Sequence, residues 1–438
     1  MLKYWNSKKH MVDVRNDSFC ECTSIMEYLL KNDKSIESHI GAEVLGPILF
    51  GFCKYIHNIK NQHNLERLFF LSRDGFIIKR AYEILFPEDI QSIGVLYVSR
   101  HSVILPLLAK ANNYDDLIKT VLPLLKDGSL NYLAKLCNID KDNFEAFIIK
   151  NNLKKEQRVN AIDSKQKEYF YNFIMENCKD RLSSSYSVFK NYLLQEKFNG
   201  NIGIVDIGWN GTIQHGLSGY TNEQDNVNGI YLGTRCFFKY TQNQKNKMFS
   251  YLFSPGVNEE FSTMGRFTAE CFDVLFAYPY EGTNLGHEDI NGLIKPIVDT
   301  SEYGEYSVKF IEKYQKAALL FIQEICNRGL KYEIEIDPQM IMNTYYSFAV
   351  TPSLKTLKPF DSMVINDGPI EKKLTCMHSV FYYMTHPSVF KQDFKNNICK
   401  IWFLKWLLKI PLPYYKILKM LTKKGVKSEM QILAEAVE

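Results

Sequence analysis

Four short apolar runs constrain the fold of this chain more than any other feature of its sequence. They are Arg67–Leu71, Gly94–Val98, Asn201–Val205 and Gly229–Leu232, and each ends abruptly at polar or glycine residues. Continuous apolar runs of this length are typical of strands that are buried on both faces of a parallel sheet. Helical patterns lie between the runs, as in βαβ units. We therefore predict an α/β protein with a Rossmann-like, mostly parallel sheet, a large helical insertion and a helical C-terminal region.

The same patterns predict how the chain is divided. We expect an N-terminal extension at 1–40, an α/β core formed by 41–102 and 198–300, a helical insertion at 103–197, a helical region at 301–394 and a basic amphipathic tail at 395–438. Within these parts, helices are predicted over Gly41–Ile59, Phe76–Leu85 and Ser307–Asn327. Because glycines and prolines are frequent at 248–300, that segment is predicted to be rich in turns.

Charge and cysteine usage exclude several classes of function. Residues 394–428 carry nine lysines and no acid, which leaves 44 basic residues against 49 acidic ones in the rest of the chain. A mildly acidic body argues against a nucleic-acid-binding protein. The ten cysteines form no C-x-x-C pair and no cluster with histidine, so no zinc site is predicted. Because the first residues lack an apolar signal core, we expect a cytoplasmic protein with free thiols.

The basic tail allows two interpretations. Residues 400–427 place Trp402, Trp406, Leu408 and Tyr414 among lysines, a pattern that fits a helix lying at the inner face of the cell membrane with its lysines reaching the lipid headgroups. The alternative is a last helix that packs on the protein and leaves a solvated basic face. The apolar stretch is too short and too charged to span a bilayer.

Polar side chains follow all four predicted strands at the point where each strand ends. Open α/β sheets bind ligands beyond the carboxyl ends of their strands, so these side chains are expected to converge. Arg73, Arg100 and Arg235 offer planar forks suited to phosphate, which indicates a phosphorylated or nucleotide-linked ligand. Asp74 and Asp206 are candidates to hold Mg²⁺ or Mn²⁺, or to act as base or nucleophile. Alternatively, Arg73 and Asp74 only cap the next helix and pair with each other.

The segment Asp206–Gln214 (DIGWNGTIQ) is the densest candidate motif. Its two glycines allow close approach of the backbone to an anion, and Thr212 is placed to open a helix. Asn210, Thr212 and Gln214 are predicted to bind substrate, and Trp209 either stacks on a sugar or base or plugs the edge of the sheet. The spacing also matches the first phosphate loop of actin-like sugar kinases, D-x-G-x-x-x-[ST].

Two further residues are candidate acids or bases. His101 follows Arg100 at a strand end, although a buried structural histidine would fit there equally well. Glu270 precedes a segment with many turns, which is expected to fold over the crevice as a lid and to bring Glu270 or His287 to the site. For His287, a position on a surface loop is the preferred interpretation.

Four strings, taken together and in order, resemble a known family. GPILFGFCKYI, LFFLSRDGFIIKRAYEILFP, LYVSRHSVILPLL and IVDIGWNGTIQ are similar to the C-terminal region of bacterial proteins described as HAD-superfamily-like predicted hydrolases, which occur in capsule and O-antigen gene clusters. The resemblance covers roughly residues 40–300. It marks Arg73, Asp74, Arg100, Asp206, Trp209, Thr212 and Gln214 as motif positions. The chain lacks the catalytic D-x-D-x-[TV] of HAD enzymes, so the resemblance implies surface-polysaccharide assembly but does not transfer HAD catalysis.

These observations predict an enzyme that transfers or hydrolyses a phosphoryl or glycosyl group on a phosphorylated or nucleotide-linked sugar. A second hypothesis is a non-catalytic module that binds a glycan or a glycosyltransferase at the membrane. A third is a sugar kinase of the actin-like type, which would bind ATP and magnesium through the loop from Asp206 to Thr212.

Overall fold

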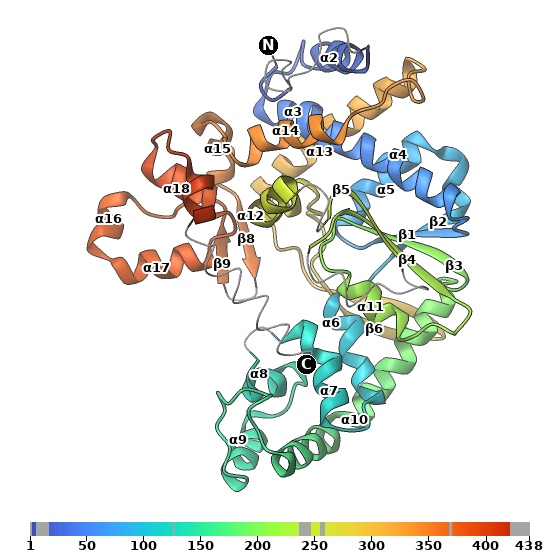
Figure 1. Ribbon diagram of the computed structural model, residues 1–438, viewed down its shortest axis with the longest axis vertical. Helices are drawn as coiled ribbons and strands as arrows, with labels where there is room; N and C mark the ends of the chain where they lie inside the picture. Colours follow the sequence, from blue (N-terminus) through green and yellow to red (C-terminus); the bar gives the residue numbers. More distant parts are fainter. Residues whose placement is uncertain are drawn as a thin grey trace.

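A five-stranded parallel sheet forms the centre of the protein in a computed structural model, which describes residues 2–5, 17–125, 128–235, 247–254, 259–367 and 370–420. The strands are β1 (Arg67–Leu71), β2 (Ile93–Leu96), β3 (Asn201–Asp206), β4 (Asn226–Gly233) and β5 (Met248–Phe253), in the order β2-β1-β3-β4-β5 (Figure 1). The predicted α/β class and all four predicted strands are confirmed. The fifth strand, β5, was not predicted.

The order of the strands creates a switch point between β1 and β3. From β1 the chain passes through α5 (Asp74–Leu85) to β2 on one side, and then crosses to β3 on the other side of β1. Leu68 pairs with Ile93 of β2 and with Gly203 of β3, both in parallel register. Connections leave in opposite directions from two adjacent strands, and sheets with such a switch point bind ligands beyond the carboxyl ends of those strands.

Helices cover both faces of the sheet, so the protein has three layers. Successive residues of β1 point to opposite faces: Leu68 and Phe70 belong to one hydrophobic cluster, Phe69 and Leu71 to another. The first face packs against α4 (Gly46–Gln62), α5 and α13 (Glu305–Asn327), and the second against α10 (Ser164–Gln195), α11 (Thr212–Ser218) and α6 (Arg100–Ile104). Burial on both faces explains why the strands are apolar throughout.

The segment between β2 and β3 is helical, as its sequence suggests, and most of it lies in a lobe below the sheet (Figure 1). It contains α6, α7 (Tyr114–Val121), α8 (Leu130–Leu136), α9 (Lys141–Lys150) and α10, with short 3₁₀ turns at Leu105–Lys110 and Leu122–Leu124. The lobe has a hydrophobic cluster of its own. Helix α10 begins at a capping box, in which Asp163 and Gln166 satisfy each other's backbone N–H groups.

The remaining helices surround the sheet on its other sides. On the N-terminal side are α2 (Asp17–Leu29), α3 (Ile36–His39) and a π-helical turn at Ile40–Leu45 that continues into α4, and a 3₁₀ turn at Pro87–Ser92 precedes β2. After α13 follow α14 (Pro338–Ala349), α15 (Leu354–Asp361), the hairpin of β8 (Val364–Asp367) and β9 (Ile370–Lys373), α16 (Val380–Thr385), α17 (Pro387–Asn396) and α18 (Lys400–Leu408). No helix in the described part of the chain is long and apolar enough to cross a bilayer.

The prediction that 248–300 is rich in turns is wrong. Apart from 255–258, which lie outside the described residues, the segment contains β5, helix α12 (Glu259–Leu275) and the hairpin of β6 (Asn284–Ile290) and β7 (Leu293–Val298). The prediction failed because two of the glycines that indicated turns lie inside regular elements, Gly265 in α12 and Gly286 in β6. His287 of the hairpin packs against Phe189 and Tyr192, and its Nε2 lies 3.0 Å from the Tyr97 carbonyl oxygen. These contacts hold the imidazole within the protein, so His287 is not a candidate acid or base.

Candidate functional site

A tight elbow joins β1 to α5 and presents Arg73 and Asp74 at the carboxyl edge of the sheet. Arg73 has φ 73° and ψ −93°, a backbone conformation that side chains rarely adopt. The elbow is held by Ser72, whose hydroxyl donates to the Val98 carbonyl at 3.1 Å and accepts from the Val98 N–H at 3.2 Å. Gly75 packs against Phe70 so closely that a Cβ would lie 2.9 Å from the Phe70 carbonyl carbon. Strain of this kind is typical of functional turns.

The loop after β3 is joined to the loop after β4. Two backbone bonds connect them, from Gly233 N–H to the Ile207 carbonyl at 3.2 Å and from Arg235 N–H to the Trp209 carbonyl at 2.8 Å. Gly208 has φ 140°, and a Cβ there would lie 2.3 Å from the Gly233 oxygen. Only glycine fits this approach. The two loops therefore move as one unit that carries Asp206, Trp209 and Arg235.

Asp74 and Asp206 form an interacting pair across the switch point. Burial raises the pKa of Asp74 to about 6, with Glu302 adding to the rise and Arg73 opposing it. Burial, followed by the charge of Asp74, raises the pKa of Asp206 to about 8, and the Ile207 N–H and two arginines oppose it. Two carboxyl groups that repel each other in a desolvated site share a proton near neutral pH. One member is then an acid and the other a base.

Helix α12 brings two more acids to the same edge. The pKa of Asp273 is well above its ordinary value, because of burial and of the charges of Asp74 and Glu270. Burial also raises the pKa of Glu270, while Arg235 and Lys400 oppose the rise. The Asp273 side chain remains exposed to solvent, although much of the protein surrounds it. Glu270 was predicted, whereas Asp273 was missed, although it lies three residues further along the same helix.

Three arginines accompany these acids. Arg73 Nη1 donates to Thr283 Oγ1 at 2.8 Å and lies 3.4 Å from Glu302 Oε1. The Arg235 guanidinium lies over the Trp209 ring, 5.3 Å from its centre. Arg100 opens α6, is exposed, and interacts with Asp206. The alternative that Arg73 only pairs with Asp74 is incomplete, since Arg73 also interacts with Asp206 and Asp273.

The prediction that Gln214 binds substrate is wrong. Its side chain is fully buried, and its amide nitrogen donates to the carbonyls of Val227 at 2.7 Å and Lys247 at 2.9 Å. Its oxygen accepts from the Tyr231 hydroxyl at 3.0 Å. Gln214 thus connects α11 to β4 and to the residue before β5. This residue is structural because every hydrogen-bonding position of its amide faces the sheet.

Four other residues were predicted to lie at the site, and the structure places each of them as follows. The Trp209 ring stacks on Phe253, with ring centres 5.7 Å apart and an interplanar angle of 12°, and so supports Arg235 from within the protein. Asn210 has a buried Oδ1 with no hydrogen-bond partner within the described ranges. Thr212 begins α11 directly after Gly211, as predicted. His101 lies on α6 with part of its surface exposed, and the protein that surrounds the rest of the ring lowers its pKa by desolvation, with no acid contributing to the shift.

Asp74 and Asp206 are the predicted metal ligands of the site. In the described part of the chain, no three His, Cys, Asp or Glu side chains converge closely enough to hold a metal ion. The pair Asp74 and Asp206 supplies two oxygen ligands, which fits the way proteins bind Mg²⁺ together with a substrate phosphate.

No protein-family model matches the chain, and no curated protein matches it significantly. The family resemblance based on motifs therefore stays a prediction.

Proposed function

We propose that this protein is an enzyme that transfers or hydrolyses a phosphoryl or glycosyl group of a phosphorylated or nucleotide-linked sugar. The observation that carries the proposal is the interacting pair Asp74 and Asp206 at the switch point of a parallel sheet, with Arg73 and Arg100 on the same edge. Among the described contacts, the one hydrogen bond that either carboxylate accepts is local, from the Ile207 N–H to Asp206 Oδ1. Interacting acids with raised pKa values are typical of a reactive site.

The charges around the pair indicate what the ligand carries. Five carboxyl groups interact here with three guanidinium groups: Asp74, Asp206, Glu270, Asp273 and Glu302 with Arg73, Arg100 and Arg235. The arginines favour an anion, and the excess of carboxylates favours a divalent cation beside it. Mg²⁺ or Mn²⁺ would be held by Asp74 and Asp206, and it would neutralise charge on a bound phosphate.

The residues of the chain then have distinct roles. Arg73 and Arg100 bind and orient the phosphate, since they follow the neighbouring strands β1 and β2 and both interact with Asp206. The two acids of the pair have alternative roles. Where they would hold a divalent cation, both are ionised; where they hold none, the protonated member donates to the leaving oxygen and the ionised member accepts a proton from the attacking hydroxyl or water. Arg235, supported by Trp209, interacts with Glu270 and Asp273 on α12 and lies at the other end of the site.

The pathway is proposed from the motif resemblance rather than from the geometry. The strings around Arg73, Asp74, Arg100 and Asp206 are similar to proteins from capsule and O-antigen gene clusters. Their sugars are carried as phosphorylated or nucleotide-linked intermediates, which is the ligand class that the three arginines favour. We therefore place the proposed reaction in bacterial surface-polysaccharide assembly.

A ligand screen tests the proposal. Purified protein is heated with nucleotide-sugars, nucleotides and sugar phosphates, each with and without Mg²⁺ or Mn²⁺, and products of the stabilising ligands are then analysed. A ligand at a hundredfold excess over its Kd stabilises by about 2.7 kcal/mol. We expect a shift that is lost in Arg73→Ala, and turnover that is lost in Asp206→Asn. Matched controls in the helical lobe, Arg158→Ala and Asp115→Asn, keep both.

The outcomes separate the competing functions. Turnover of a sugar phosphate or nucleotide-sugar supports the enzyme proposed here. A thermal shift with a glycan or sugar but no product, in protein whose acid variants bind equally well, identifies a binding module instead. A shift with ATP and Mg²⁺ alone, followed by phosphate transfer to a sugar, identifies a sugar kinase. Wild-type turnover in folded Asp74→Asn and Asp206→Asn proteins refutes the role of the pair.

A further inference from the structure

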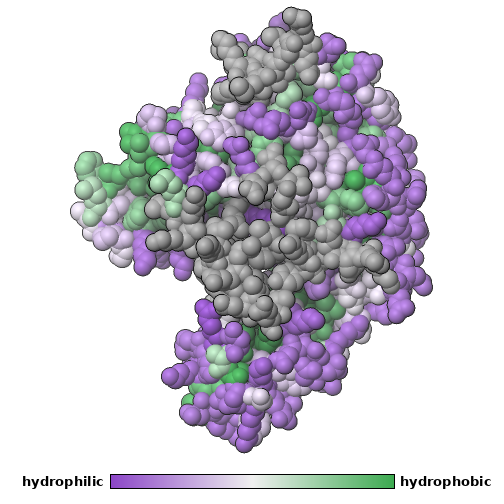
Figure 2. All heavy atoms as spheres, in the orientation of Figure 1, coloured by the Kyte–Doolittle hydropathy of each residue, from purple (hydrophilic) through white to green (hydrophobic). Residues whose placement is uncertain are grey.

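Apolar side chains are exposed on one side of the C-terminal helices. Phe381 and Met384 on α16 are 79% and 75% exposed, and Leu408, Ile410 and Leu412 are exposed where α18 ends and the chain continues. Figure 2 shows apolar side chains gathered over α16 and α17, at the left edge of the molecule. Solvent-exposed aromatic and aliphatic side chains in a contiguous group mark a surface that contacts something else. We call this group the α16–α18 surface.

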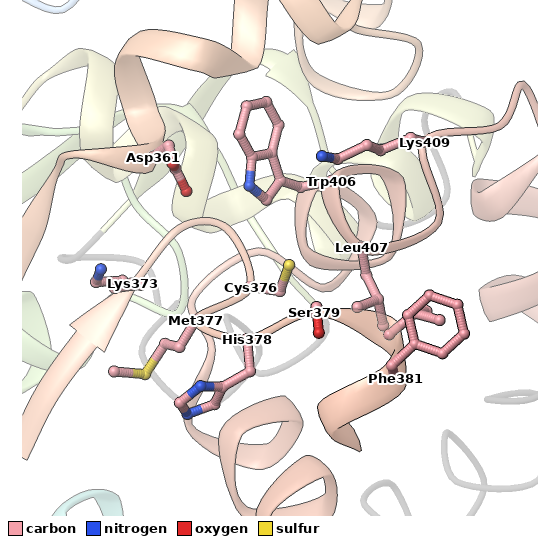
Figure 3. A pocket seen from close by; sticks show the side chains of 11 residues that line it. Asp361, Lys373, Cys376, Met377, His378, Ser379, Phe381, Trp406, Leu407 and Lys409 are labelled. Atoms are coloured by element: carbon pink, nitrogen blue, oxygen red, sulfur yellow. The ribbon is translucent and has the colours of Figure 1, made fainter. Parts of the chain in front are cut away.

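A pocket of about 430 Å³ lies within this surface, between α16 and the end of α18. Lys373, His378, Phe381, Trp406 and Lys409 are among the side chains that line it (Figure 3). The Lys409 ammonium lies 5.7 Å from the centre of the Trp406 ring. Within the described ranges, neither Lys373 nor Lys409 has an ion-pair partner. The pocket therefore offers two cations beside apolar walls.

The charge around the pocket is mostly positive. From Cys376 to Met420 the chain carries seven lysines and one acid, Asp393. Asp393 is engaged within the protein, since it accepts from the Tyr383 hydroxyl at 2.8 Å and lies 3.9 Å from His378. The second acid nearby, Asp361, lines the pocket and accepts from Thr375 Oγ1 at 2.8 Å. A surface that combines exposed apolar side chains with an excess of lysines over acids is complementary to an anionic bilayer.

We propose that the α16–α18 surface docks on an anionic lipid bilayer, with Phe381 and Met384 inserted among the lipids and a headgroup phosphate in the pocket between Lys373 and Lys409. This corrects the sequence-based picture of how residues 400–427 would meet a membrane. Trp402 and Tyr414 were expected in the interface, but both are buried in the protein core, and residues 421–427 lie outside the described part of the chain. The proposal is independent of the catalytic one.

Vesicle flotation tests this docking. Full-length protein is floated with vesicles of phosphatidylcholine alone and with vesicles containing phosphatidylglycerol, at low and high salt. We expect binding only to the anionic vesicles, weakened by salt. The variant Lys373→Gln with Lys409→Gln is expected to bind about 30-fold more weakly, since each lysine near a charged bilayer contributes about 1 kcal/mol. Phe381→Ser with Met384→Ser is expected to lose binding at any salt concentration.

Controls use side chains of the same kind elsewhere on the protein. Ile149→Ser with Lys150→Gln alters an exposed pair on α9 and is expected to bind like the wild type. The triple change of Lys423, Lys424 and Lys427 to Gln tests the segment that the structure does not describe, and it too is expected to keep most of the binding. Unchanged melting temperatures show that the variants are folded, which is expected because the changed side chains are at the surface.

Three results would overturn the proposal. The first is equal binding of the wild type to neutral and anionic vesicles, or to neither. The second is loss of binding in the Lys423, Lys424 and Lys427 variant while the α16–α18 variants still bind. The third is a wild-type dimer in solution that Phe381→Ser converts to a monomer, because the surface would then be covered by a second copy of the chain.

Discussion

Among single residues, the carboxylates show most clearly what the fold imposes on the chain. Asp74, Asp206 and Asp273 come from three separate elements, and the charge of Asp74 raises the pKa values of both Asp206 and Asp273. Glu43 is fully buried and has the opposite situation, because its carboxylate accepts backbone N–H groups from Lys3, Tyr4 and Trp5 at 2.6–2.9 Å. The first group is held against neighbouring charge of the same sign, and Glu43 is held by backbone donors.

The pair Asp74 and Asp206 makes stability depend on pH. Their pKa values of about 6 and about 8 in the folded protein lie above the ordinary 3.8. Between pH 4 and 8 the folded state therefore holds protons that the unfolded chain has released, so rising pH lowers the free energy of unfolding. We expect Asp206→Asn to remove much of this fall and to raise the melting temperature at pH 8 by about 2 °C or more.

Thermal denaturation from pH 5 to pH 8 measures the effect. The informative quantity is the difference in melting temperature between the two ends of the range, compared in wild type and Asp206→Asn. The exposed Asp115→Asn serves as control and should reproduce the wild-type slope. An unchanged slope in Asp206→Asn would show that this carboxyl group does not hold an extra proton in the folded protein.

Glu43 is predicted to anchor the start of the chain. It is fully buried, also bonds His39, and lies in the π-helical turn before α4. In Glu43→Gln an amide NH₂ faces backbone donors, which leaves buried groups unpaired and should cost about 2–4 kcal/mol of unfolding free energy. Urea denaturation measures the loss, and Glu335→Gln, at a surface ion pair with Lys54, should cost less than about 0.5 kcal/mol. Equal effects of the two changes would rule out the anchor.

Among helices and loops, positions depend on contacts that local patterns do not encode. The loop Asp206–Gly211 keeps its shape through backbone bonds to the loop after β4. Helix α12 bends at Thr268, whose φ of −132° interrupts the helix and whose carbonyl accepts from the Tyr345 hydroxyl at 2.6 Å. This bend comes just before Glu270 and Asp273, so α14, which carries Tyr345, helps to aim both acids.

Gly208→Ala is predicted to disturb the candidate site through the backbone alone. The added Cβ would lie 2.3 Å from the Gly233 oxygen at a φ that alanine rarely adopts, so the two loops must separate, at a cost of about 2–4 kcal/mol. Ligand affinity should fall with stability, since Arg235 moves with this loop. Gly286→Ala is the matched control, because nothing lies within 4 Å of its Cβ position. Indistinguishable melting curves for the two variants would contradict the close approach.

Helix α18 is predicted to contribute its first turn to the core and its end to the α16–α18 surface. Trp402 is fully buried against Phe348 and Phe360, and its Nε1–H donates to the Ala349 carbonyl at 2.9 Å. Trp402→Ala should cost about 3–5 kcal/mol of unfolding free energy. Trp406→Ala, at the half-buried pocket wall, should cost clearly less but weaken vesicle binding. Chemical denaturation and flotation of both variants give the comparison, and the reverse ranking would refute it.

At the scale of the whole molecule, the helical lobe and the sheet have separate hydrophobic clusters, and helix α10 connects them. Phe170, Ile174, Cys178 and Leu182 of its first half belong to the lobe, and Phe189, Tyr192 and Leu193 of its second half pack on the sheet. Packed clusters that share few contacts open as separate cooperative units. The lobe is therefore free to unfold while the candidate site stays intact.

Hydrogen exchange tests this division. Leu133→Ala, in the lobe, should cost about 2–5 kcal/mol locally and speed amide exchange in residues 114–182, while β1 and β3 exchange at the wild-type rate. Phe189→Ala, on the sheet side of the same helix, is the counterpart and should speed exchange in the strands. Faster exchange throughout the chain in both variants would show that the lobe and the sheet form one cooperative unit.

The sequence by itself determined the elements that are buried on all sides. β1 was predicted residue for residue, because a strand covered on both faces must be apolar whichever strands lie beside it. Strand β5 (MFSYLF) was missed because most of its side chains are only partly buried at the edge of the sheet. The positions of Asp74 and Asp206 at strand ends were predicted for a related reason. Where a buried apolar run changes to polar residues, the strand has reached the edge of the sheet.

Only the tertiary structure decided which of these groups meet. The placement of β3 beside β1 brings Asp206 to Asp74, and the packing of α12 brings Asp273 to Asp74. Tertiary packing also turned Gln214 into an internal link and buried Trp402, although the sequence placed them in a binding loop and a basic tail. A local pattern specifies which residues of an element are apolar. It does not specify the partner, because contacts between residues far apart in the chain depend on how all the elements pack together.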